Sequence, residues 1–106
     1  MKKRIKLSNQ AERFIYGLPT TAIAKLTASL ERLSQEGRLP APYAEKVEGR
    51  DNLFEIRVKD GEQVRVFYAY AKGDDVWLLS GFIKKTQKTP PAEIRKALRI
   101  RKELGL

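Results

Sequence analysis

The spacing of the apolar residues changes at about residue 53, and this change limits the folds that the chain can adopt. Before it, apolar residues recur three or four positions apart, as on one side of a helix: Ile23, Leu26, Leu30 and Leu33. After it, residues 53–59 alternate between apolar and polar, as in a strand with one buried face. Helices and strands therefore occupy separate stretches of the chain, which predicts an α+β fold.

Three strand-like segments follow one another after residue 53. In the first, 53–59, alternation places Phe54, Ile56 and Val58 on one face and Glu55, Arg57 and Lys59 on the other. Asp60-Gly61 is a common hairpin sequence, and the second segment spans 63–70. A turn at 73–75 leads to residues 76–83, which are apolar almost throughout, as in a central strand covered on both faces. These segments predict a three-strand antiparallel meander.

The segments on either side of the meander are mostly helical. Residues 2–7 are expected to form a short strand, and Ser8 to cap a helix over 9–16. A second helix begins at Thr20 or Thr21 and ends at Gly37, and a loop covers 38–52. Thr89 is the expected N-cap of a final helix that starts at Pro90, with an apolar face of Ile94, Ala97, Leu98 and Leu104. At 106 residues, the whole chain, 1–106, is expected to be a single domain.

The positive charge is concentrated at the two ends of the chain. The net charge is +9, yet the middle is close to neutral, because the excess cations lie in residues 1–6 and 82–106. This distribution favours a binding surface for an anionic partner. The absence of cysteine and histidine excludes thiolate and imidazole chemistry, including metal sites built from those ligands. No signal peptide or membrane span is recognisable, so we expect a cytoplasmic protein.

Two arginines of the meander are candidates for an anion site. With a turn at Asp60-Gly61, Arg57 and Arg65 are expected to lie opposite each other on one face of the sheet. Two guanidinium groups at that distance repel each other unless an anion bridges them or a carboxylate, from Glu55 or Glu62, neutralises them. The sequence alone leaves both alternatives open.

A lysine-rich stretch, 84–88, follows the last strand and adds Lys84, Lys85 and Lys88 to the same edge. Together with the arginines it predicts a surface that follows a phosphate backbone. RNA can be cleaved there without a metal, because its own 2′-OH can attack the adjacent phosphate while cations stabilise the added charge. Four residues are candidates for proton transfer: Lys84, Lys85, Glu55 and Tyr68. Further contacts to nucleic acid are expected from Lys59, Arg95 and Arg99.

Two stretches, LFEIRVKDGEQVRVFYAY at 53–70 and WLLSGFIKKTQKTPPAEIRKALRIRKEL at 77–104, resemble the RelE/ParE superfamily of type II toxins. The similarity is greatest to its HigB-like branch, which includes phage-derived proteins. The resemblance implies a twisted antiparallel sheet, made of an N-terminal strand and the three-strand meander, with an N-terminal helical hairpin and a C-terminal helix. It also implies a ribosome-dependent mRNA endonuclease that needs no cofactor and is neutralised by a helix-turn-helix antitoxin.

The resemblance also implies roles for single residues. Arg57 corresponds to a basic residue that contacts the scissile phosphate, and Arg65 to the strand arginine that stabilises the transition state. Lys84 and Lys85 correspond to basic residues after the last strand, and Lys88 to a contact with the RNA backbone. The chain departs from the pattern at Glu55, where RelE-type toxins have a basic residue. It also has no tyrosine after Tyr70 and no histidine for proton transfer.

Two other functions are compatible with the same fold. The ParE side of the superfamily inhibits DNA gyrase and cleaves no RNA, and an inactive relative would act only as a binding module. Growth arrest with fragmented mRNA would indicate the endonuclease. Supercoiling defects with intact mRNA would indicate the gyrase inhibitor, and normal growth would indicate the binding module.

Overall fold

A computed structural model describes residues 2–106, and its helices and strands occur in the expected order apart from one additional strand, β2. In chain order they are β1 (Arg4–Leu7), α1 (Asn9–Tyr16), α2 (Thr20–Glu36), β2 (Ala44–Lys46), β3 (Phe54–Asp60), β4 (Glu62–Tyr70), β5 (Asp75–Lys84) and α3 (Pro91–Glu103). The predicted α+β class, the helical hairpin, the meander and the C-terminal helix are all confirmed.

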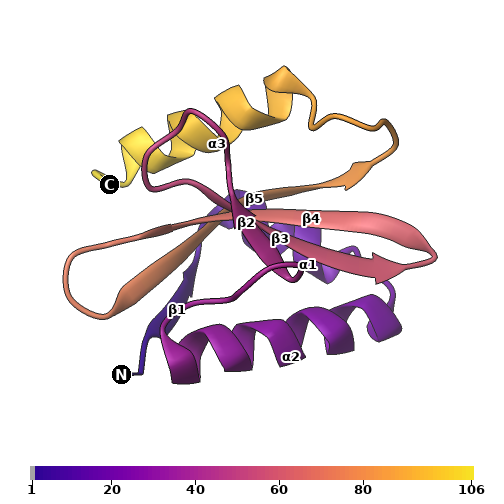
Figure 1. The fold of residues 1–106 in the computed structure, drawn as a ribbon, viewed down its shortest axis with the longest axis horizontal. Helices are drawn as coiled ribbons and strands as arrows, with labels where there is room; N and C mark the ends of the chain where they lie inside the picture. Colours follow the sequence, from indigo (N-terminus) through magenta and orange to yellow (C-terminus); the bar gives the residue numbers. More distant parts are fainter. Residues whose placement is uncertain (1) are drawn as a thin grey trace.

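The five strands form one open sheet in the order β1-β5-β4-β3-β2 (Figure 1). The meander β3-β4-β5 is antiparallel, as predicted. The outer strands differ from the prediction. β1 runs parallel to β5, so the sheet is mixed, and β2 lies inside the stretch that was expected to be a loop. The strand within residues 2–7 was predicted, and only its direction was not. The three residues of β2 are too few to produce a recognisable alternation, so the sequence carries little signal for this strand.

The sheet lies between two helical layers, which are visible below and above it in Figure 1. α1 and α2 cover one face, over a core that includes Leu26 and Ile56. α3 covers the other face, where Phe67, Leu79 and Ala97 are fully buried. β5 contributes to both cores, because its neighbouring residues point to opposite faces. This arrangement confirms that the third strand of the meander is central and covered on both sides.

Most of the predicted helix ends are confirmed. The Ser8 hydroxyl accepts a hydrogen bond of 3.1 Å from the Ala11 backbone N–H, as an N-cap does, and it donates one to the carbonyl of Leu79 in β5. Gly37 ends α2 in the left-handed conformation, with a φ of 81°. The prediction for α3 was wrong by one residue, since Pro90 occupies the cap position. The Thr89 side chain is used elsewhere, in a hydrogen bond to Glu55.

A tight contact between α1 and the sheet occurs at Gly81 of β5. A Cβ atom at this position would lie 2.2 Å from Cδ2 of Phe14. The Phe14 ring therefore occupies the space that any larger residue at position 81 would need. The glycine allows α1 to pack directly on the strand that leads to the lysine-rich loop.

Candidate nucleic-acid interface

Arg57 and Arg65 are direct partners in the β3–β4 hairpin, as the turn at Asp60-Gly61 predicts. Alternation places both side chains on the sheet face that α3 covers, because Phe67, two positions from Arg65, is buried in that core. The two residues differ in exposure. The Arg65 side chain is 9% exposed, whereas that of Arg57 is 35% exposed. The predicted pair of opposed guanidinium groups is thus present, with one member at the surface and the other beneath it.

Glu55 lies between the two arginines. Its Oε1 atom is 3.6 Å from Nε of Arg57 and 3.5 Å from Nε of Arg65, and its side chain is only 5% exposed. A second carboxylate, from Glu45 on β2, lies 3.1 Å from Nη2 of Arg57. Of the two alternatives left open by the sequence, neutralisation by Glu55 is therefore realised, while Glu62 pairs with Lys85 instead. β3 was expected to have one polar, exposed face, and this prediction fails at Glu55.

The arginine pair still has unused hydrogen-bonding capacity. Both Nε atoms are buried and have no hydrogen-bond partner among residues 2–106, although the Glu55 carboxylate is near. The Arg65 guanidinium is held from its other side by the Val64 carbonyl at 3.1 Å and by Gln63 Oε1 at 3.2 Å. Burial lowers the pKa of Arg65, the Glu55 carboxylate raises it, and the nearby Arg57 charge lowers it. Arginine nevertheless stays charged, so two permanent positive charges lie on either side of the Glu55 carboxylate.

A groove of about 460 Å³ lies over this cluster, between β2, β3 and the loop that follows β5. Its lining includes Arg57, Lys84 and Lys88, together with Lys46 of β2. Arg65 lies beneath and does not line it. Four basic residues line the groove, the three named and Lys46, against three acidic ones, Glu45, Glu48 and Glu55. Since the excess is a single charge, an anion that binds here competes with the carboxylates for Arg57.

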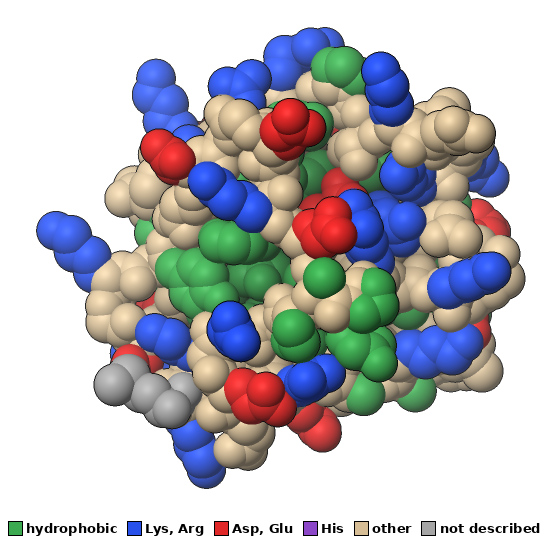
Figure 2. Space-filling model, in the orientation of Figure 1, with side chains coloured by type: hydrophobic (Ala, Val, Ile, Leu, Met, Phe, Trp, Pro, Cys, Tyr) green, Lys and Arg blue, Asp and Glu red, His purple; other side chains and the backbone are tan. Residues whose placement is uncertain are grey.

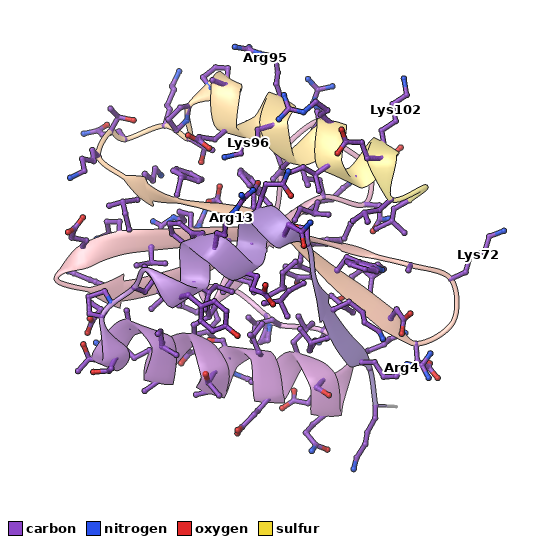
Figure 3. All side chains as sticks on the ribbon, turned by 180° about the vertical axis from the view of Figure 1, so that it is seen from behind. Arg4, Arg13, Lys72, Arg95, Lys96 and Lys102 are labelled. Atoms are coloured by element: carbon purple, nitrogen blue, oxygen red, sulfur yellow. The ribbon has the colours of Figure 1, made fainter. Side chains whose placement is uncertain are left out.

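The structure brings some of the predicted site residues into this groove and leaves others outside. Lys84, Lys88 and Glu55 line it together with Arg57. Lys85 is exposed and pairs with Glu62 at 3.7 Å, at the end of the β3–β4 hairpin. Lys59 is exposed beside α2, and Arg95 and Arg99 lie on the exposed side of α3. Figure 3 shows Arg95 pointing away from the sheet. These last three residues do not face the groove.

Tyr68 lies outside the predicted site, on the other face of the sheet. It is 1% exposed, lies in the core beneath α1 and α2, and stacks on Phe54 with 5.1 Å between the ring centroids. Burial raises the pKa of its hydroxyl well above the ordinary tyrosine value. Alternation explains the position, because Tyr68 follows Phe67, which points to the α3 side, and neighbouring residues of a strand point to opposite faces. Proton transfer by Tyr68 is therefore excluded by its position.

The structure adds two residues that sequence reasoning did not assign to the site. Lys46 lines the groove from β2 and lies 3.5 Å from the Asp51 carboxylate. Thr89, expected to be a helix cap, donates its hydrogen bond to Oε2 of Glu55 at 2.8 Å. No periodic signal marks Lys46, because β2 is so short. The sequence places Thr89 next to the lysines, but it carries no signal for the hydrogen bond from Thr89 to Glu55 of β3.

Comparisons with known proteins connect this geometry to a family. A family model described as "Phage derived protein Gp49-like (DUF891)" matches residues 13–102, which is most of the chain. The chain belongs to this Gp49-like family. No curated protein matches its sequence significantly.

Solved structures of RelE toxins have a fold similar to that of this Gp49-like chain. The free-state structure of a mutant of Escherichia coli toxin RelE matches with a TM-score of 0.73 and 18% identity, over 93% of this chain and 97% of that one. The archaeal RelE–RelB complex from Pyrococcus horikoshii matches with a TM-score of 0.65 and 22% identity, over 78% and 96%. A toxin–antitoxin complex, RelBE2 of Mycobacterium tuberculosis, matches with 0.60 and 18%, over 79% and 100%. The fold that the resemblance to the RelE/ParE superfamily predicts is confirmed.

Two structural features are absent from residues 2–106 of the Gp49-like chain. None of its described helices combines the length and the apolar character that crossing a membrane requires. Nor do the described residues contain three or more acidic, histidine or cysteine side chains grouped so that they could hold a metal ion.

Proposed function

We propose that this Gp49-like protein is the toxin of a type II toxin–antitoxin system and acts in the cytoplasm as a ribosome-dependent mRNA endonuclease of the HigB-like type. One observation carries the proposal. Arg57 and Arg65 are opposed on one sheet face, directly under a groove that also contains Lys84 and Lys88. Among the described residues, the Nε atoms of these two opposed guanidinium groups have no hydrogen-bond partner. Such a pair is suited to a phosphodiester, which offers several acceptor oxygens.

In the proposed reaction, the 2′-OH attacks the adjacent phosphorus and the bond to the 5′-oxygen breaks, which leaves a 2′,3′-cyclic phosphate. Arg57 and Lys88 bind the phosphate at the groove surface, and Arg65 stabilises the negative charge that develops on it. This role for Arg65 requires Glu55 to move, because its carboxylate now lies beside both Nε atoms. A metal is not needed for any of these steps.

Proton transfer is assigned to Lys84 and Glu55. Lys84 lines the groove and forms no ion pair among residues 2–106, so its ammonium group is available to protonate the leaving 5′-oxygen. When the phosphate takes over the guanidinium groups, the Glu55 carboxylate is released and accepts the proton of the 2′-OH. Lys85, paired with Glu62 outside the groove, is not assigned to the reaction.

The partner of such a toxin is a cognate antitoxin, and we propose one of the helix-turn-helix class. Support for an antitoxin partner, though not for its class, comes from the matched RelE structures that were solved as complexes with an antitoxin. The net charge of +9 favours an acidic segment in that partner, so antitoxin affinity is expected to fall as salt rises. An affinity that does not depend on salt would indicate a mainly apolar interface.

The test is cleavage of a synthetic mRNA on programmed ribosomes, with the fragment ends mapped. Arg57→Ala and Arg65→Ala are each expected to reduce cleavage at least about 100-fold, as loss of a transition-state donor does. Glu55→Gln is expected to reduce the rate while RNA binding persists. Lys72→Ala is the matched control, because Lys72 is an exposed cation in the turn between β4 and β5 and does not line the groove (Figure 3). Equal activity of Arg57→Ala, Arg65→Ala and the parent would contradict the proposal.

Expression in cells separates the proposed function from its alternatives. Growth arrest with fragmented mRNA supports the endonuclease. Arrest with intact mRNA and defective supercoiling would identify a gyrase inhibitor of the ParE type. Normal growth would indicate an inactive binding module, for which the neutralised arginine pair would be the structural reason.

A further inference from the structure

Tyr43 lies outside the groove and is exposed to solvent, so it does not contribute to either hydrophobic core. Tyr43 directly precedes β2, and 48% of its surface is accessible. It lines a second cleft, of about 310 Å³, between α2 and β3. This cleft also contains Arg57, which lines the groove as well. The groove and the cleft therefore share Arg57, the residue that is proposed to bind phosphate.

The Tyr43 ring is held in place by its surroundings. The Arg32 guanidinium lies over the ring, 5.4 Å from its centroid, and is itself fixed by Glu36 at 3.2 Å. The Tyr43 backbone N–H donates to the Pro40 carbonyl at 2.9 Å, and its carbonyl accepts from the Arg57 N–H at 2.8 Å. The half-exposed ring also borders the cleft, so a planar group bound in the cleft can contact it.

The walls of the cleft combine apolar and basic groups. Ala28 and Val58 provide apolar surface, while Lys25 and Lys59 provide positive charge. The Lys25 ammonium is tied to Asp60 at 3.0 Å and to the Lys59 carbonyl at 2.9 Å, whereas Lys59 has no ion pair among residues 2–106. On the molecular face shown in Figure 2, exposed hydrophobic side chains gather in patches bordered by basic and acidic ones. An aromatic ring beside cations matches a flat, apolar group that is covalently attached to an anion.

We propose that Tyr43 stacks on one base of the RNA strand whose phosphate is bound at Arg57, which makes the cleft a base-binding subsite. The inference rests on the proposed RNA cleavage, and it deepens that proposal by naming a residue that binds a base next to the cut. Stacking on tyrosine favours every base to some degree, so the subsite adds affinity more than sequence selectivity. An acidic peptide is a less suitable occupant, because carboxylates alone would leave the exposed ring without a partner.

The experiment uses the ribosome cleavage assay with a set of mRNAs in which one nucleotide near the cut lacks its base. For the parent protein, one abasic position is expected to lower kcat/KM by about five-fold to about 150-fold, the range of one base–aromatic stack. Tyr43→Ala is expected to cut the intact mRNA with the same loss and to show no further loss at that abasic position. Tyr43→Phe keeps the ring and is expected to behave like the parent.

Tyr16→Ala is the matched control, since Tyr16 is an even more exposed tyrosine, at the end of α1. Its cleavage is expected to equal that of the parent on every mRNA. Normal cleavage by Tyr43→Ala, or a full abasic effect in that variant, would overturn the inference while leaving the proposed function intact. If the parent cuts none of the mRNAs, the proposed function fails, and the inference that rests on it fails too.

Discussion

Thr89 donates a hydrogen bond of 2.8 Å to Oε2 of Glu55, and thereby fixes the lysine-rich loop to the start of β3. The other carboxylate oxygen, Oε1, lies beside the Nε atoms of Arg57 and Arg65. One buried carboxylate thus connects three segments that are far apart in the sequence: β3, β4 and the loop after β5. The shape of the groove depends on this connection.

Replacing Thr89 by valine tests the connection directly. Thr89→Val removes the hydroxyl but keeps a branched side chain, and a hydrogen bond to a charged group contributes about 1.5–3 kcal/mol. Because Thr89 is half-buried, we expect a loss of about 1–2 kcal/mol in the free energy of unfolding, measured with urea. The control is Thr86→Val, whose hydroxyl bonds only the exposed Lys88 carbonyl. Equal effects of the two substitutions would contradict the connection.

Removal of Glu55 should convert the arginine pair into an anion site. Glu55→Ala leaves two guanidinium groups opposed without their carboxylate, and breaking a buried ion pair costs about 3 kcal/mol or more. Inorganic phosphate should restore part of this stability, so it should raise the Tm of Glu55→Ala more than that of the parent. Glu62→Ala, which breaks an exposed pair with Lys85, is the control and should respond to phosphate as the parent does. An equal response of Glu55→Ala and the parent would show that the arginines do not bind the anion.

The opposition of Arg57 and Arg65 was predictable, because a tight turn and an alternating pattern together fix the register of a hairpin. The same alternation assigns Tyr68 to the opposite face, so the signal that excludes it from the site was present in the sequence. Burial of Glu55 was not predictable in this way, since it depends on how α3 and its loop cover the sheet. Lys46 escaped prediction because the three residues of β2 gain their structure only by pairing with β3.

The contact between Gly81 and Phe14 predicts a strong response to one added methyl group. Gly81→Ala places a Cβ 2.2 Å from the Phe14 ring, and such overpacking costs about 1–3 kcal/mol or more. We expect this loss in urea unfolding, and partial recovery in the double variant Gly81→Ala with Phe14→Leu. Gly17→Ala is the control, because its nearest non-neighbouring atom would be 3.5 Å away and its φ is −84°. A loss that Phe14→Leu does not reduce would mean that the ring is not its cause.

Alkaline pH should destabilise the fold through its buried tyrosines. Burial raises the pKa of both Tyr68 and Tyr70 above the ordinary value of 10.0, so the folded state keeps protons that the unfolded state releases. Stability is therefore complete below about pH 10 and falls as the pH rises toward the folded-state pKa. For one fully protected tyrosine the loss reaches about 1.4 kcal/mol at about one unit above the ordinary pKa. Urea unfolding at about pH 8, 10 and 11 measures this loss, and Tyr68→Phe should reduce it. Equal pH dependence in Tyr68→Phe and the parent would show that Tyr68 ionises no less readily in the folded state than in the unfolded chain.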